Sequence, residues 1–264
     1  RAAFSSSVAK GQLLFGMDET RLSFALTKDS KGYPRVLVII PAYNEQECIL
    51  NTVASIKAAG YDYVVINDGS RDGTLRLCRE HDVNILDLPQ NLGIGGAVQA
   101  GHKYAQRFGY DIDIQVDGDG QHDPSYIPEL VKLIEGGASL AIGSRFLVET
   151  DGFQSTFMRR VGIRWLSFLL KLLTGKAVTD PTSGFRACNK DAIDLFCKSY
   201  PDDYPEPESI ALAMKLGLPV MEAPVKMNER QGGRSSIGVL SSVYYMIKVT
   251  LAIVLVCWIH RGDQ

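Results

Sequence analysis

Short apolar runs alternate with segments of helical character through residues 35–145, and this alternation constrains the fold more than any other feature. A continuous run of Val, Leu and Ile is typical of a strand that is buried on both faces. Strands alternating with helices predict an α/β fold with a mainly parallel sheet and right-handed crossovers. The expected strands are residues 36–40, 63–66, 83–88, 112–116 and 140–142.

Two helix starts carry recognisable signals. Asn44, followed three residues later by Glu47, has the pattern of a capping box, and that helix is expected to end near Gly60. Asp123 as N-cap and Pro124 as first helical residue predict another helix. Beyond residue 150 we expect an amphipathic helix and a second βα-like stretch, at residues 158–173, 180–186, 191–197, 208–215 and 220–225.

Length and charge narrow the class of protein. A chain of 264 residues with 45% hydrophobic content can bury one large core. The formal net charge of −2 gives no general attraction to nucleic acid, so we expect no nucleic-acid partner. The five cysteines form no C-x-x-C pair, which favours reduced thiols and argues against a zinc site.

The two ends of the chain differ from its middle. Residues 1–32 have no sustained period and are expected to be a flexible leader or tail, which leaves residues 33–234 as the main domain. Residues 235–264 are predicted to form a C-terminal apolar helix. Its dense apolar part, residues 249–259, is shorter than the roughly 20 residues that cross a bilayer. We interpret it as an interfacial, membrane-associated helix with a core helix as the alternative.

Polar residues directly follow several of the predicted strands. Residues 41–45, Asp68, residues 117–121 and Arg145 each come after a strand, and ligands of parallel sheets bind where strands end. We therefore expect these positions to converge at one edge of the sheet.

The strongest local signal is Asp117-Gly118-Asp119. Two carboxylates one residue apart, with the amide oxygen of Gln121 nearby, suit Mg²⁺ or Mn²⁺ together with a diphosphate. The alternative is a solvated Asp- and Gly-rich turn. His122 is more simply a satisfied neighbour than a ligand, and the N-cap position already explains Asp123.

Several other charged residues each allow a functional and a structural interpretation. The arginines are candidate anion contacts, because guanidinium suits phosphate, although a single arginine is usually a surface or paired charge. Glu206 and Glu208 are either a catalytic base or caps of the following helix, and Asp180 is a further candidate base for a hydroxyl acceptor. The candidate arginines are Arg145, Arg160, Arg164 and Arg186.

Five motifs, in this order, resemble glycosyltransferase family 2. More narrowly, they are similar to the dolichol-phosphate mannose synthase and bacterial polyprenyl-phosphate glycosyltransferase branch. The motifs are Val38-Ile39-Ile40-Pro41-Ala42-Tyr43-Asn44-Glu45, Asn67-Asp68-Gly69-Ser70, Asn91-Leu92-Gly93, Asp117-Gly118-Asp119-Gly120-Gln121-His122 and Gly143-Ser144-Arg145-Phe146. The segment from Asp180 to Arg186 resembles a further block of that branch, which lies near the acceptor.

The resemblance implies a GT-A, Rossmann-like fold and an inverting, metal-dependent transfer from a nucleotide-sugar to a polyprenyl phosphate, undecaprenyl or dolichyl. It implies nucleoside contacts from Pro41, Tyr43, Glu45 and Asp68, and donor and metal binding by Asp117 and Asp119 with Gln121. Asp119 and Arg145 would be catalytic, and Arg145, Arg160 and Arg186 would face the acceptor phosphate.

The expected location is the cytoplasmic face of a membrane. Whether the chain forms a homo-oligomer stays open. Two alternatives also stay open at this point. One is transfer to a saccharide or protein hydroxyl, and the other is an inactive nucleotide-sugar-binding protein.

Overall fold

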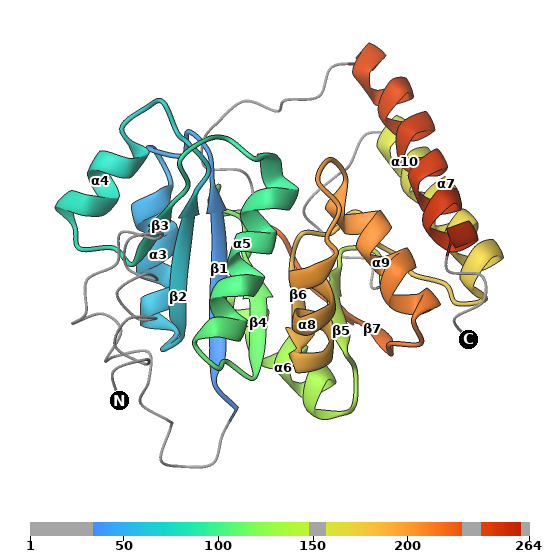
Figure 1. Ribbon diagram of the computed structural model, residues 1–264, viewed down its shortest axis with the longest axis horizontal. Helices are drawn as coiled ribbons and strands as arrows, with labels where there is room; N and C mark the ends of the chain where they lie inside the picture. Colours follow the sequence, from blue (N-terminus) through green and yellow to red (C-terminus); the bar gives the residue numbers. More distant parts are fainter. Residues whose placement is uncertain (1–33, 148–156, 229–238, 260–264) are drawn as a thin grey trace, which may run out of the picture.

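The computed structural model describes residues 34–147, 157–228 and 239–259, and its core is a seven-stranded sheet (Figure 1). The strand order is β3-β2-β1-β4-β6-β5-β7, and every pairing is parallel except those of β6. This confirms the predicted α/β fold with a mainly parallel sheet. The expected leader and the basic loop at residues 231–235 lie outside the described residues.

The elements follow the predicted alternation. The strands are β1 (Val36–Ala42), β2 (Asp62–Asn67), β3 (Ile85–Asp87), β4 (Ile112–Gln115), β5 (Leu140–Ser144), β6 (Arg186–Asn189) and β7 (Val220–Pro224). The helices are α3 (Ile49–Ala58), α4 (Thr74–Glu80), α5 (Gly93–Arg107), the 3₁₀ turn η1 (Pro124–Tyr126), α6 (Ile127–Glu135), α7 (Phe157–Thr174), α8 (Lys190–Lys198), α9 (Pro205–Lys215) and α10 (Val239–Ile259).

Successive residues of the central strand β1 face two separate cores. Leu37 and Ile39 lie in a cluster with residues of α5, α8 and α9, whereas Val38 and Ile40 lie in a cluster with residues of α3, α4 and α6. All four side chains are fully buried. Because side chains alternate across a strand, a strand covered on both faces must be apolar at every position, which explains the unbroken run.

The antiparallel strand β6 was not predicted. It lies between β4 and β5, with Asp113 opposite Cys188 and Ala141 opposite Ala187. Its four residues include Arg186 and Asn189, so no apolar run indicated a strand there. The stretch that we expected to begin another βα unit instead returns across the sheet.

One predicted helix start is wrong and the other is confirmed. Asn44 has φ of +58° and its Oδ1 accepts a hydrogen bond from the backbone of Arg71, so it joins two loops, and α3 begins only at Ile49. At the second site, Asp123 Oδ1 accepts from the backbone nitrogen of Ser125 at 2.9 Å, as an N-cap does.

The C-terminal helix α10 packs against α7 and α9 (Figure 1). Val249, Ile253 and Cys257 face the core, while Leu251 and Trp258 on the other side are mostly exposed. None of the helices in the described part of the chain combines the length and apolar character that a bilayer-crossing segment needs.

Candidate active site

The loops that follow β1 and β2 are bound to each other at the carboxyl edge of the sheet. The backbone nitrogen of Asn44 donates to Ser70 Oγ at 3.0 Å, and that of Glu45 donates to Thr74 Oγ1 at 2.9 Å. Within this frame Pro41 is buried, Glu45 is half-buried and the ring of Tyr43 is 44% exposed. These positions can thus present a flat aromatic face and a carboxylate to a ligand.

Asp68 joins this edge to the loop after β3. Its Oδ1 accepts from the backbone nitrogen of Leu92 at 2.6 Å, and its carbonyl accepts from Asn91 Nδ2 at 3.0 Å. Burial raises the pKa of Asp68, while hydrogen bonds from the backbone of Leu92 and Gly93 oppose that rise. Asp68 therefore holds the 91–93 loop in place, and one carboxylate oxygen is committed to that task.

Asp117 and Asp119 follow β4 directly, beside the loop after β1. Asp117 Oδ1 accepts from Gln115 Nε2 at 3.1 Å, and Asp119 Oδ1 accepts from the backbone nitrogen of Gln121 at 3.1 Å. The Asp117 side chain is 38% exposed, whereas Asp119 is buried. A Cβ on Gly184 would come within 3.2 Å of both Asp117 carboxylate oxygens, so the glycine leaves this carboxylate room. Carboxylate oxygens are ligands that Mg²⁺ and Mn²⁺ prefer, and the Asp117 carboxylate is partly open to solvent, so these two residues could hold such an ion.

His122 supports the turn that carries Asp117. Its Nδ1 accepts the backbone N–H of Asp117 at 3.0 Å, and its ring stacks on Phe185 with 5.0 Å between the ring centroids. An accepting Nδ1 places the proton of a neutral ring on Nε2, which lies 3.8 Å from Asp117 Oδ2. His122 thus holds the backbone of Asp117, as expected of the hydrogen-bonded neighbour that the sequence suggested.

Arg145, after β5, forms a buried ion pair with Asp180. Arg145 Nε lies 2.6 Å and Nη2 2.7 Å from the two carboxylate oxygens, and Nη2 also donates to Thr182 Oγ1 at 2.9 Å. Asp180 is fully buried, so it belongs to this pair and is not placed to act as a base. The pair fixes the Arg145 guanidinium at the edge of the site.

Arg186 and Arg160 occupy very different places. Arg186 is 2% exposed and donates to the carbonyls of Ser183 and Glu206 and to Ser209 Oγ, which holds the start of α9 against β6. All of its described contacts are therefore internal. Arg160 is exposed on α7.

Glu206 and Glu208 lie in the first turn of α9 but in different surroundings. Burial raises the pKa of Glu206, with opposing contributions from the guanidinium groups of Arg186 and Arg145 and a further raising contribution from Asp117. Burial also raises the pKa of Glu208, and its charged neighbours are Asp202 and Asp203. Of the two, only Glu206 has Asp117 and Arg145 among the charges that contribute to its pKa shift.

The carboxyl edge of the sheet thus carries an acidic turn and a buried Arg–Asp pair, where ligands of α/β proteins usually bind. The chain belongs to glycosyl transferase family 2, because the domain of that family matches residues 37–196. This confirms both the resemblance seen in the sequence and the assignment as an enzyme.

Several relatives within this family are named for transfer to lipid phosphates. The UDP-N-acetylglucosamine–dolichyl-phosphate N-acetylglucosaminyltransferase of Methanococcus voltae is 32% identical over 72% of this chain and 84% of its own length. The polyprenol monophosphomannose synthase of Mycolicibacterium smegmatis is 31% identical over 76% and 80%. The undecaprenyl-phosphate mannosyltransferase of Micrococcus luteus is 32% identical over 76% and 86%.

Solved structures share the fold. Glucosyl-3-phosphoglycerate synthase from Mycobacterium tuberculosis, in complex with phosphoglyceric acid, superposes with a TM-score of 0.66 at 19% identity, covering 92% of this chain and 85% of that one. Its complex with Mn²⁺, uridine diphosphate and glucosyl-3-phosphoglycerate gives a TM-score of 0.63 at 20% identity, covering 92% and 84%. These likenesses confirm the GT-A architecture.

Proposed function

We propose that this chain is an inverting, metal-dependent glycosyltransferase that moves a sugar from a nucleotide-sugar to a polyprenyl phosphate at a membrane surface. The named relatives of the preceding section support the lipid-phosphate acceptor. The main structural support is one short segment, residues 203–206, which lies between the acidic site and the exposed apolar helices.

The donor would lie on the loops after β1, β2 and β4. Pro41, Tyr43, Glu45 and Asp68 would hold the nucleoside, and Asp117, Asp119 and Gln121 would hold Mg²⁺ or Mn²⁺ beside the diphosphate. A divalent ion in such a site supplies Lewis-acid stabilisation of charge on the leaving diphosphate. The Mn²⁺ and uridine diphosphate in the complex of the structural relative are consistent with this arrangement.

The acceptor chemistry explains why an arginine matters more than a base. A phosphate monoester is largely dianionic at neutral pH, because its second pKa is about 6. One of its oxygens can therefore attack the anomeric carbon as the bond from that carbon to the diphosphate oxygen breaks, and no proton has to be removed. Arg145, fixed by Asp180, would orient the acceptor phosphate, with Arg160 as a contact nearer the lipid. Arg186, which is buried and engaged with protein acceptors, has no part in the proposal.

The membrane surface would be formed by α7 and α10 together. The two helices touch, with Trp165 Nε1 donating to Thr250 Oγ1 at 3.0 Å. Exposed apolar side chains form one stripe on each helix, and α7 adds an exposed basic stripe next to its own. The apolar residues are Val161, Trp165, Phe168, Leu172, Tyr244, Ile247, Leu251, Val254, Leu255, Trp258 and Ile259, and the basic residues are Arg160, Arg164 and Lys171. Apolar surface bordered by basic side chains is typical of interfacial helices on anionic bilayers.

The described contacts tie this surface to the acidic site. Lys248 of α10 forms an ion pair with Asp203 and lies over the ring of Tyr204 at 5.3 Å. Two residues later, burial raises the pKa of Glu206, and the charges of Asp117 and Arg145 contribute to the shift. A lipid phosphate anchored beside α10 would therefore be close to the segment that borders the donor site.

One observation favours a hydroxyl acceptor as the second candidate. Burial raises the pKa of Glu206 near the donor site, which suits a general base, and the structural relative forms a product on phosphoglycerate.

Substituting the two glutamates separately distinguishes these acceptors. With a lipid phosphate, Glu206→Gln should keep most of the transfer activity, because no proton is removed. If Glu206 is the base for a hydroxyl acceptor, the same change should reduce turnover by about 10²- to 10⁴-fold. Glu208→Gln is the matched control, since its carboxyl faces Asp202 and Asp203 and should have little effect in either case. A large loss for Glu206→Gln alone contradicts the lipid-phosphate proposal.

A further inference from the structure

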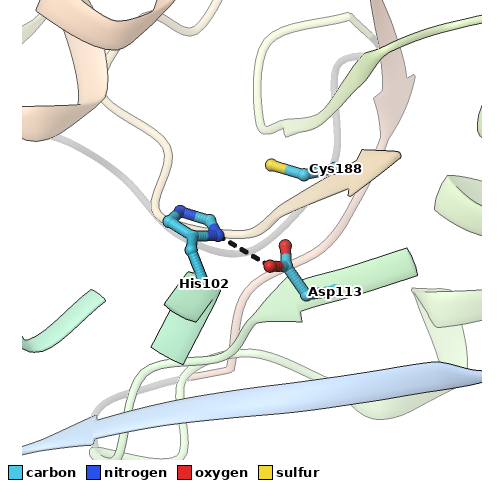
Figure 2. Close-up of side chains that lie close together, drawn as sticks. All are labelled: His102, Asp113 and Cys188. Carbon is cyan, nitrogen blue, oxygen red and sulfur yellow. Dashed lines mark hydrogen bonds and ion pairs between the residues drawn. The ribbon is translucent and has the colours of Figure 1, made fainter. Parts of the chain in front are cut away.

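A second group of ligating side chains lies in the core, away from the acidic turn. His102 of α5, Asp113 of β4 and Cys188 of β6 each offer one donor atom, and these atoms all lie within 4.8 Å of one another (Figure 2). Asp113 is four residues before Asp117 on the same extended segment, a separation of about 13 Å at roughly 3.3 Å per residue. The cluster is therefore distinct from the proposed donor site.

All three side chains are almost completely buried. His102 is 2% exposed, Asp113 1% and Cys188 1%. His102 Nδ1 lies 2.7 Å from Asp113 Oδ2, but within the described residues His102 Nε2 and Asp113 Oδ1 have no hydrogen-bond partner. Because buried polar atoms are nearly always paired, Asp113 Oδ1 indicates that the cluster takes a further partner, whereas His102 Nε2 points away from the other two side chains (Figure 2).

Two aromatic rings border the cluster. The rings of Phe196 and Tyr200 lie 5.3 and 5.1 Å from that of His102, measured between centroids, and the Tyr200 hydroxyl is a further buried atom without a partner in the described chain. A buried cluster with one nitrogen, one oxygen and one sulfur donor differs in kind from the all-oxygen set at Asp117 and Asp119.

The donor set selects the metal. Zn²⁺ accepts imidazole, carboxylate and thiolate together, whereas Mg²⁺ and Mn²⁺ prefer oxygen. A thiolate and a carboxylate with one Zn²⁺ and a neutral imidazole sum to zero charge, which suits a buried position. Ligands on a tetrahedral Zn²⁺ lie about 3.4–3.7 Å apart for bonds of roughly 2.0–2.3 Å. Binding would therefore replace the His102–Asp113 hydrogen bond and separate these two atoms by several tenths of an ångström.

We propose that His102, Asp113 and Cys188 form a buried Zn²⁺ site of three protein ligands. Binding through His102 Nδ1 would release the proton of the Cys188 thiol to solvent, and the Nδ1 proton would move to Nε2, so that the imidazole stays neutral. The ion would join α5 to β4 and to the antiparallel strand β6. The cysteine spacing in the sequence indicated no zinc site. Spacing detects only ligands that are neighbours in sequence, whereas these three ligands come from separate elements.

The test is metal analysis of the full, untagged chain after loading with Zn²⁺ and gel filtration. We expect one Zn²⁺ per chain in the parent, in Cys197→Ser and in Asp119→Asn, with loss in Cys188→Ser. Cys197 is the matched control because it is a neighbouring cysteine outside the cluster. If Asp119→Asn still retains Zn²⁺, the ion is not the donor-site metal. The result therefore does not depend on the proposed function.

Replacing Zn²⁺ with Co²⁺ needs no variant and keeps the proposal testable if Cys188→Ser does not fold. The parent should then show a thiolate-to-cobalt charge-transfer absorption. A parent that retains less than a tenth of an equivalent of Zn²⁺ and lacks this absorption would overturn the proposal and leave the cluster as a metal-free hydrogen-bonded core. Unchanged Zn²⁺ content in folded Cys188→Ser would overturn it equally.

Discussion

Removing Arg145 should destabilise the fold as well as the site, because Arg145 neutralises a buried carboxylate. Asp180 is fully buried, and Arg145 reaches both of its oxygens at 2.6 and 2.7 Å. Leaving one partner of a buried ion pair uncompensated costs about 3–5 kcal/mol. Arg145→Ala should therefore lower the free energy of unfolding by about that amount, before any effect on acceptor binding.

Urea denaturation followed by circular dichroism measures this cost. With an m-value near 3 kcal/mol per molar urea, the midpoint should fall by about 1–2 M. Adding Asp180→Asn to Arg145→Ala should recover part of the loss, because the neutral amide no longer needs a counter-charge. Arg76→Ala is the control, since its pair with Glu80 is exposed and worth only about 0.5 kcal/mol.

Two outcomes would refute this reasoning. One is a midpoint for Arg145→Ala within about 0.3 M of the parent, which by the same m-value is less than about 1 kcal/mol. The other is strict additivity of the two substitutions. If the expected result is obtained, acceptor experiments should use Arg145→Lys, and activity should be compared only among variants that remain folded.

Three further predictions follow from other parts of the structure. Both Gly60 and Gly69 have positive φ, which costs any other residue roughly 1–2 kcal/mol. Gly69→Ala should lower stability more than Gly60→Ala, because only at Gly69 would a Cβ meet backbone, at 2.9 Å. Equal midpoints in urea would contradict the close approach. Trp258→Ser should weaken sedimentation with anionic vesicles more than Met221→Ser, since both residues are exposed but only the first lies on α10; equal binding would argue against the α7–α10 surface. Because the pKa of Glu206 is raised in the folded state, the folded protein keeps this proton at pH values above the ordinary pKa of 4.5. Stability should therefore fall as pH rises from 4.5 through the raised folded pKa, and Glu206→Gln should remove that part of the pH dependence. An unchanged profile in denaturation at several pH values would contradict the burial of this carboxyl.

The sequence predicted the parts of the fold that depend on local pattern. The runs in β1 and β2 are apolar because both faces are covered, and Asp123 caps a helix through its own neighbours. The position of Asp117 and Asp119 at the end of β4 followed from the same pattern. Each of these features is determined within about ten residues of chain.

The remaining features depend on contacts between distant segments. Arg186 was expected to face an acceptor phosphate, but packing of α9 buries it, and one sequence does not distinguish a buried arginine from an exposed one. Asn44 was expected to cap α3, yet it bonds to a loop 27 residues away. The antiparallel return of β6 between β4 and β5 likewise joins distant segments, and the sequence did not indicate it.

The central claim is transfer of a sugar to a lipid phosphate, and product partition tests it most directly. The purified chain would be incubated with radiolabelled nucleotide-sugars, Mn²⁺ and vesicles containing undecaprenyl phosphate, followed by extraction into organic solvent. We predict label in the organic phase as an acid-labile glycosyl phospholipid, dependent on the polyprenyl phosphate and abolished by EDTA. Label that stays in water as a glycosylated saccharide or accumulates on protein, with the organic phase at background for every donor, would contradict the account.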